Sequence, residues 1–145
     1  MIRLSRKSLL ALEAVLDVAL HARPDPVQAR DITARQGVPQ RYLEQVMQAL
    51  VRAGILRGVR GPRGGYRLAR ERRRISVREI FEVIEEIDGN DVDMLSKSDL
   101  GRVVIAPFHA NMQAALVGAV GDTTIADLCS QADRTGGDDK ADFTI

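Results

Sequence analysis

A mainly α-helical fold with one small β-hairpin is predicted by three patterns along the 145 residues of the chain. Apolar side chains recur at helical spacing in several segments, which is typical of amphipathic helices. A turn rich in glycine and proline separates two short β-capable segments, as in a hairpin. Prolines, glycines and capping residues mark where the predicted helices begin and end.

Three helices are predicted before the hairpin, at about residues 6–22, 28–35 and 40–53. Pro24 and Pro26 separate the first from the second, because proline cannot continue a helix. Gly37 follows the second helix, where a left-handed residue would end it. Gly54 ends the third helix.

The first and third of these helices each carry an apolar stripe that predicts their buried side. Ser5 is suited to cap the first helix, whose predicted stripe is Leu9, Leu12, Leu16, Ala19 and Leu20. The stripe of the third helix follows i, i+3, i+4, i+7 and i+8 spacing and consists of Leu43, Val46, Met47, Leu50 and Val51.

A hairpin is predicted over residues 55–69, since 61–65 read Gly-Pro-Arg-Gly-Gly and only a turn or loop accommodates them. Behind it, Ser76 and Glu79 form a capping box that starts a helix to Ile87. A longer helix is predicted at about 100–120, and Pro107 either begins it or bends it. A last short helix covers about 124–132, and we expect the polar residues from Asp133 onward to be mobile.

The predicted elements follow the layout of a winged helix-turn-helix, which is a helix, a short helix, a glycine turn, an amphipathic helix and a hairpin, in this order. The major groove of DNA admits one α-helix, so the helix at 40–53 can bury its stripe and present its polar face to base edges. Gln45 and Gln48 carry the amide that pairs with adenine, and Glu44 can accept a hydrogen bond from cytosine. Arg41 and Arg52 can reach guanine or phosphate.

The hairpin offers a second candidate contact with DNA. Its tip has little bulk, since Gly61, Pro62, Gly64 and Gly65 surround Arg63, so Arg63 can enter a narrow minor groove. Residues 52–74 contain nine arginines and one acid. Those on or near the strands are Arg57, Arg60 and Arg67.

The charge of the chain is divided unevenly along its length. Residues 1–75 hold 16 Lys/Arg and 6 Asp/Glu, whereas residues 76–145 hold 5 and 14, so a balance of +10 is followed by one of −9. This asymmetry favours a front half that binds a polyanion. A polar helix face, a glycine turn or an arginine run can each be only solvated surface, and it is their occurrence together in this order that favours DNA binding.

Other functional classes find little support in the composition. No apolar run approaches the roughly 20 residues that span a bilayer, and Glu13 and Asp17 interrupt what would be a signal peptide. A single cysteine, Cys129, fits a reducing cytoplasm and excludes an internal disulfide framework. With two histidines and no nucleophile–base pairing at readable spacing, we expect a cytoplasmic protein that is not an enzyme.

Two motifs, YLEQ at 42–45 and RGPRGGYRLA at 60–69, resemble those of the Rrf-type bacterial transcriptional regulators, the relatives of IscR, NsrR and CymR. The resemblance is close over about residues 2–88 and looser up to Leu128. It implies a homodimer held by the helix at 100–120, with one recognition helix and one wing on each half of a near-palindromic operator. It adds Tyr42 and Gly64 to the DNA-binding residues and implies dimer contacts at Val104, Phe108, Met112 and Leu116.

The chain departs from this family where many members hold an iron–sulfur cluster through three cysteines. The matching stretch, about 89–106, contains no cysteine, and its carboxylates Asp91, Asp93 and Asp99 are poor substitutes for thiolates. We therefore expect no cofactor and no metal. His109 is interpreted as an ordinary residue, with a ligand role as the alternative, and His21 as a cation at a helix carboxyl end.

Three parts follow from these patterns: a DNA-binding region at 1–75, a linker, sensing loop and dimerisation helix at 76–132, and a flexible tail at 133–145. The principal hypothesis is a repressor that answers to an unidentified small molecule or protein. The alternatives are a protein-interaction module on the same scaffold and a cluster sensor that uses non-cysteine ligands. Cys129 is interpreted as a small buried hydrophobe, because a redox switch would require an exposed thiol with a partner.

Overall fold

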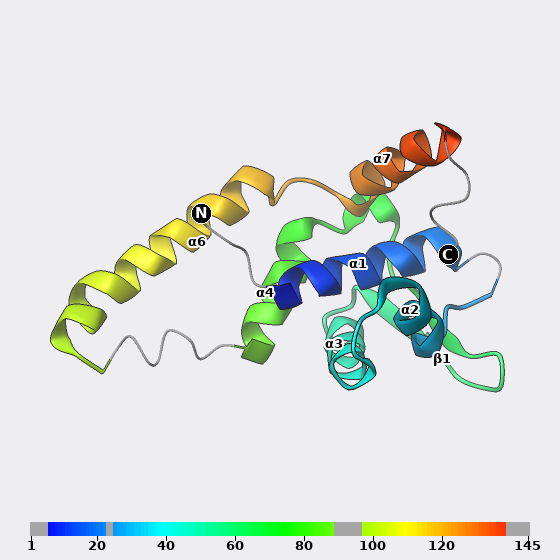
Figure 1. The fold of residues 1–145 in the computed structure, drawn as a ribbon, viewed down its shortest axis with the longest axis horizontal. Coiled ribbons are helices and arrows are strands. Elements are labelled where there is room, and N and C mark those ends of the chain that lie inside the picture. Colours follow the sequence, from blue (N-terminus) through cyan, green and yellow to red (C-terminus); the bar gives the residue numbers. More distant parts are fainter. Residues whose placement is uncertain (1–5, 23–24, 89–96, 139–145) are drawn as a thin grey trace.

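A computed structural model describes residues 6–22, 25–88 and 97–138 (Figure 1). Ser5, Asp91 and Asp93 lie outside the described residues. In chain order the elements are α1 (Arg6–His21), α2 (Ala29–Gln36), α3 (Gln40–Arg52), β1 (Leu56–Val59), β2 (Gly65–Leu68), the 3-10 helix η1 (Arg72–Arg74), α4 (Val77–Asp88), the π-helical turn η2 (Gly101–Ile105), α6 (Ala106–Val120) and α7 (Ile125–Asp138). The predicted fold, mainly α with a hairpin wing, is confirmed.

Helix α1 lies in the middle of the molecule, with α7 on one side and α2 and α3 on the other (Figure 1). Its fully buried side chains are small and include Ala11, Ala14 and Val15. The predicted leucine stripe is therefore wrong as the centre of the buried face, and Leu9 is 46% exposed. A helix that is packed on several sides buries the small side chains that allow its neighbours to approach, while its leucines fill the margins.

A buried carboxylate joins α1 to α2. Asp17 is 1% exposed and accepts hydrogen bonds from Arg35 Nε at 2.9 Å and Arg35 Nη2 at 2.7 Å. Gln36 Nε2 donates to the same carboxylate at 2.7 Å. The side-chain hydrogen bonds with Asp17 raise the pKa of Arg35 above its ordinary value. This bidentate pair sets how α2, and with it the turn into α3, is placed on α1.

The turn between α2 and α3 forms as its residues predict. Gly37 has a φ of 67° and its N–H donates to Thr33 O at 2.9 Å, which is the left-handed end expected of that helix. Four side chains of the predicted α3 stripe are buried, from Leu43 to Leu50, and Val51 is half-buried. The helix thus presents its opposite face to solvent.

Strands β1 and β2 pair antiparallel, with Leu56 opposite Leu68 and Arg57 opposite Arg67. A bridge between Val27 and Tyr66 adds a short third segment, and the Tyr66 N–H donates to Val27 O at 2.7 Å. The hairpin is therefore attached at its base to the α1–α2 connection as well as to α3.

The predicted capping box begins α4. Ser76 N–H donates to Glu79 Oε2 at 3.0 Å, and Glu79 N–H donates to Ser76 Oγ at 3.3 Å. Arg70 donates to the other Glu79 oxygen at 2.9 Å. Desolvation raises the pKa of Glu79, but the Ser76 backbone N–H and Arg70 outweigh it, so the pKa lies below its ordinary value.

The long helix extends away from the other elements (Figure 1). Pro107 stands directly behind the π-helical turn, in which the Ala106 N–H donates to Gly101 O. The α-helix α6 begins at Ala106 with Pro107 in its first turn, which is one of the two predicted alternatives, and the π-helical turn η2 precedes it. Proline has no N–H for the α-helical bond to residue i−4, and a wider turn accommodates that loss.

No residue of α6 is buried in the single chain. Phe108 is 63% exposed, and Leu100, just before the π-helical turn, is 69% exposed. Gly101–Val120 is a helix of 20 residues that is long and apolar enough to cross a membrane by length and composition. The expectation that no apolar segment approaches this length is therefore wrong. It considered only uninterrupted apolar runs, whereas this helix is apolar overall with a few polar residues between its apolar ones.

Helix α7 returns to the core. The Ile125 N–H donates to Ile75 O at 2.9 Å, and the Val77 N–H donates to Thr123 O at 2.9 Å. Ile125 and Cys129 join the same core cluster as α1, and Cys129 is 1% exposed, as expected of a small buried hydrophobe. The helix runs to Asp138 rather than to about 132, since the anchored first turn lets the polar residues behind it continue the helix.

Candidate nucleic-acid interface

The solvent face of α3 carries the polar side chains that the sequence singled out. Because the apolar stripe of the helix packs on α1, α4 and the hairpin, the residues between its members point outward. The exposed residues are Arg41, Glu44, Gln45, Gln48 and Arg52. Gln40 Nε2 donates to Glu44 Oε1 at 3.2 Å, so a neighbouring amide already engages this carboxylate.

Tyr42 has a different environment from the other predicted residues of α3. It is half-buried, and its hydroxyl donates to Lys7 O at 2.9 Å. The Lys7 ammonium lies 5.7 Å from the centre of the tyrosine ring, within cation–π range. Tyr42 therefore holds the first turn of α3 against the start of α1, a contact between residues 35 apart that the sequence did not predict.

The hairpin presents its arginines along its length and at its tip. Arg57, Arg60 and Arg63 are exposed. Arg67 is half-buried, and its Nη1 lies 3.5 Å from Ala22 O. The tip thus carries one long cation on a turn of small residues.

Gly64 shapes this tip through its lack of a side chain. Its N–H donates to Gly61 O at 2.9 Å, which closes the turn. A Cβ at Gly64 would lie 2.2 Å from Val59 O, closer than atoms can approach. Gly65 meets the same limit, with 2.4 Å to Val27 O. These positions require glycine because backbone carbonyls occupy the space of a side chain.

Helix α3 and the hairpin lie on the same side of α1, away from α7 and α6 (Figure 1). The structure therefore brings the polar face of α3 and the arginine-bearing hairpin to one side of the molecule. This surface is basic, and its charge includes Arg41 and Arg52 on the helix and Arg57, Arg60 and Arg63 on the hairpin.

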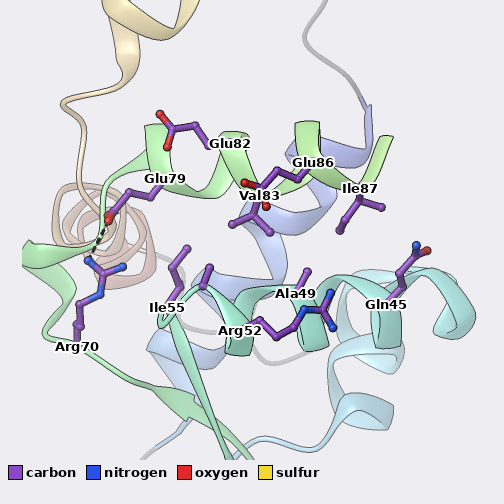
Figure 2. A pocket seen from close by; sticks show the side chains of 11 residues that line it. Gln45, Ala49, Arg52, Ile55, Arg70, Glu79, Glu82, Val83, Glu86 and Ile87 are labelled. Atoms are coloured by element: carbon purple, nitrogen blue, oxygen red, sulfur yellow. Dashed lines mark hydrogen bonds and ion pairs between the residues drawn. The ribbon is translucent and has the colours of Figure 1, made fainter. Parts of the chain in front are cut away.

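A cleft of about 600 Å³ borders this surface between α3 and α4 (Figure 2). Gln45 and Arg52 line it from α3, and Glu82 and Glu86 line it from α4. Within the part of the chain that the structure describes, Arg52 forms no ion pair or hydrogen bond. The position of these acidic residues beside α3 could not be read from the sequence, because it depends on how two distant helices pack.

A sequence profile of the Rrf2 family, described as an iron-dependent transcriptional regulator, matches residues 4–131. The chain belongs to the Rrf2 family. The resemblance stated from the YLEQ and RGPRGGYRLA motifs is confirmed by this match, which covers the fold from α1 to α7.

Relatives of this Rrf2 chain include the HTH-type transcriptional regulator IscR of Xenorhabdus nematophila, which is 45% identical over 84 residues, 58% of this chain and 51% of its own. The IscR of Vibrio cholerae is 44% identical over 84 residues, 58% of this chain and 49% of its own. The matched segment therefore spans about half the length of these relatives.

Solved Rrf2-type structures show the same fold over most of their length. IscR of T. potens superposes with a TM-score of 0.71 and 31% identity, covering 92% of this chain and 90% of that one. CymR of B. subtilis, titled a global cysteine regulator, superposes with a TM-score of 0.67 and 26% identity, covering 90% of this chain and 98% of that one.

The iron dependence in the family description can be tested against the donors of this Rrf2 chain. Cys129 is the only cysteine of the sequence and lies in the core. His109 is half-buried on α6, where its Nε2 lies 3.4 Å from Gln113 Nε2. Among residues 6–22, 25–88 and 97–138, no group of three or more His, Cys, Asp or Glu side chains is placed to hold a metal. These residues do not fit a thiolate-held iron–sulfur cluster.

Proposed function

We propose that this protein is a cytoplasmic, sequence-specific DNA-binding repressor that acts as a homodimer on a near-palindromic operator, without an iron–sulfur cluster and without enzymatic activity. The single observation that carries the proposal is the pairing, on one side of the molecule, of the polar face of α3 with the arginine-bearing hairpin. DNA is the partner that fits both, because one groove takes the helix and the phosphates flanking it attract the arginines.

Within this proposal the side chains of α3 and the wing have separate roles. Gln45 and Gln48 read base edges in the major groove, and Arg63 enters the minor groove from the hairpin tip. The other exposed cations neutralise phosphates, which sets affinity and register but not sequence. The supporting relatives are the IscR proteins, whose name describes an HTH-type transcriptional regulator.

The homodimer is supported by the apolar surface of the long helix. Val104 and Phe108 are exposed, and Met112 and Leu116 are half-buried, on a helix with no buried residue in the single chain. Exposed apolar surface of this kind marks a site of interaction with a partner. A second copy of the chain is the occupant we propose, and the two copies would then place two α3 helices on two half-sites.

The proposed absence of a cluster is supported by the donor set, since one core cysteine does not supply the several thiolates that such clusters require. The signal is then a small molecule or a protein. Iron and acid-labile sulfide in anaerobically purified protein test this point. Stoichiometric iron would contradict it and would favour non-cysteine ligands such as His109.

Selection from a random duplex pool, followed by fluorescence anisotropy, tests DNA binding. We expect one near-palindromic sequence to be enriched. Log Kd should rise steeply and linearly with log salt concentration, because binding of the protein releases cations that were condensed on the DNA. Light scattering on the complex should give two chains per duplex.

The competing candidate is a protein-interaction module, favoured by the same exposed α6. It predicts no enrichment of any duplex and binding partners that survive nuclease treatment.

A further inference from the structure

A second cleft, of about 270 Å³, lies between the carboxyl end of α1 and the hairpin with the segment that follows it. Its apolar lining comes from α1 and from β2. Its charged lining is strongly unbalanced and consists of Arg57, Arg67, Arg70, Arg72 and Glu71. Four guanidinium groups against one carboxylate make a small, strongly positive concavity.

The nearby carboxylates neutralise only part of this cleft. Glu71 is engaged by Arg73, whose Nε lies 2.7 Å from Glu71 Oε2, and Arg73 does not line the cleft. Glu79 pairs with Arg70 at 2.9 Å, which leaves Arg57, Arg67 and Arg72 as the cations of the cleft. Arg57 is exposed and forms no ion pair or hydrogen bond within the described part of the chain.

The backbone of α1 holds two of the arginines in place. Arg72 Nη2 donates to Ala19 O, and Arg67 Nη1 lies 3.5 Å from Ala22 O. Both acceptors belong to the carboxyl end of α1, where carbonyl groups lack partners within the helix and cations are favoured. The guanidinium groups are thus positioned before any ligand arrives, which lowers the entropic cost of binding.

One donor in this cleft is buried without an acceptor. Arg72 Nε has no hydrogen-bond partner in the structure although solvent does not reach it. Buried polar groups are nearly always satisfied, and a charged donor left without an acceptor is particularly unfavourable. Arg72, which lines the cleft, therefore has a donor that an acceptor oxygen would satisfy.

We propose that this cleft is a binding site for a tetrahedral oxyanion such as a phosphate group, held by Arg57 and Arg72 with Arg67 beside them. Guanidinium groups bind phosphate oxygens through paired charge-assisted hydrogen bonds, and the cleft has room for the anion with several waters. The anion is either a phosphate of bound DNA or a free phosphate-bearing molecule. The site itself does not depend on the proposed repressor function.

Inorganic phosphate titrated into the DNA-free protein tests the site, with the arginine Nε–H signals followed by NMR and sodium chloride added in parallel to the same ionic strength. We expect the Arg72 Nε–H signal to move with phosphate and not with chloride. Arg57→Gln should weaken phosphate binding about tenfold, the scale of one charge-assisted hydrogen bond. Arg57 is exposed and without a partner in the described residues, so this variant should fold normally.

Arg60→Gln is the matched control, because Arg60 belongs to the loop of the same hairpin, is exposed and does not line the cleft. It should bind phosphate as the parent protein does. Equal responses to phosphate and chloride, or equal losses in the two variants, would overturn the proposal.

Repeating the titration on the DNA complex separates the two sources of the anion. If bound duplex removes the phosphate response, a DNA phosphate occupies the site. If the response persists, the ligand is a free anion. A protein that binds no DNA would still show the phosphate response of the DNA-free titration, so failure of the oxyanion site and failure of the repressor proposal are distinguishable.

Discussion

Neighbouring residues of α3 have different roles because the helical repeat turns them to different sides. Met47 is buried against the core, and Gln48 beside it is exposed on the face that we propose contacts DNA. On the hairpin, Arg63 is exposed beyond a turn that Gly64 keeps narrow. At this scale, affinity and base preference should respond to different substitutions.

Arg63→Ala should weaken binding to every duplex by about 1–3 kcal/mol, whereas Gln48→Ala should mainly relax preference at particular base pairs by a similar amount. The measurement is anisotropy on the selected duplex and on single-base variants of it. Arg134→Ala, on the exposed side of α7, is the control and should match the parent. Parent-like binding by both test variants would contradict the proposed groove contacts.

Gly64→Ala should destabilise the hairpin by about 1–3 kcal/mol, because its Cβ would lie 2.2 Å from Val59 O. Amide hydrogen exchange in β1 and β2 should rise while the core amides stay protected. Gly58→Ala is the control within the same hairpin, since nothing lies within 4 Å of its Cβ position. Equal protection of the hairpin in the two variants would refute this account of the turn.

Whole elements are positioned by a small number of polar contacts at their ends. Glu79 joins the start of α4 to the segment behind the hairpin through Ser76 and Arg70. Farther along the same helix, Glu82 and Glu86 stand beside α3 across the cleft of Figure 2. The ends of α4 thus contribute to stability, and its exposed side should influence how DNA approaches α3.

Acidification should reduce the contribution of Glu79 to stability. Its pKa in the folded chain lies below the ordinary value of 4.5, so this contribution is complete above that value and is lost as pH falls through the folded pKa. Urea unfolding gives the free energy of unfolding of the parent and of Glu79→Gln. The difference between the two should be smaller at pH 3 than at pH 7. Glu85→Gln, on the exposed side of α4, should show no such change; a pH-independent difference for Glu79→Gln would argue against the linkage.

Glu86→Gln should raise affinity for random-sequence DNA roughly two- to fivefold, the scale of a surface charge interaction of about 0.2–1 kcal/mol. The reason is that Glu86 opposes phosphate near Arg52 and Gln45, which line the same cleft. The measurement is anisotropy at low salt, where the gain should be largest. Glu85→Gln serves again as control, since Glu85 does not line the cleft. An equal gain in affinity for both variants would mean that only the net charge of the protein matters, and would contradict a specific role of Glu86.

The whole molecule combines a core that closes on α1 with one helix that does not take part in it. Residues from α1, α3, α4 and α7 share one cluster, and the buried Asp17–Arg35 pair holds α2 to it. Helix α6 has no buried residue, and its apolar side chains are exposed or half-buried. In the homodimer that we propose, a second copy of the chain covers α6.

Phe108→Asp should weaken the proposed homodimer at least about tenfold, since it places a charge among apolar contacts. Because Phe108 is 63% exposed in the single chain, the variant should remain folded. Sedimentation velocity gives the oligomeric state, and circular dichroism the helix content. Gln131→Glu, which adds one charge on the exposed side of α7, is the control. If the Phe108→Asp protein stays dimeric, this face of α6 is not part of the interface.

Elements whose causes are local could be predicted from the amino-acid sequence. The α3 stripe, the Gly37 helix end, the Ser76–Glu79 box and the glycine turn of the hairpin each depend on residues a few positions apart, so spacing sufficed to predict them. The same patterns also named the exposed residues of α3 and the hairpin, because burial of one helix face leaves the other in solvent.

The buried side of α1 and the contacts between distant groups depend on how the elements pack together. The leucine stripe misled because neighbours on several sides of α1 select its small side chains. The Asp17–Arg35 pair, the placement of Tyr42 against Lys7 and the arginine cleft with Arg72 join residues from 18 to 53 positions apart. Such contacts follow from how helices pack, which no local periodicity records.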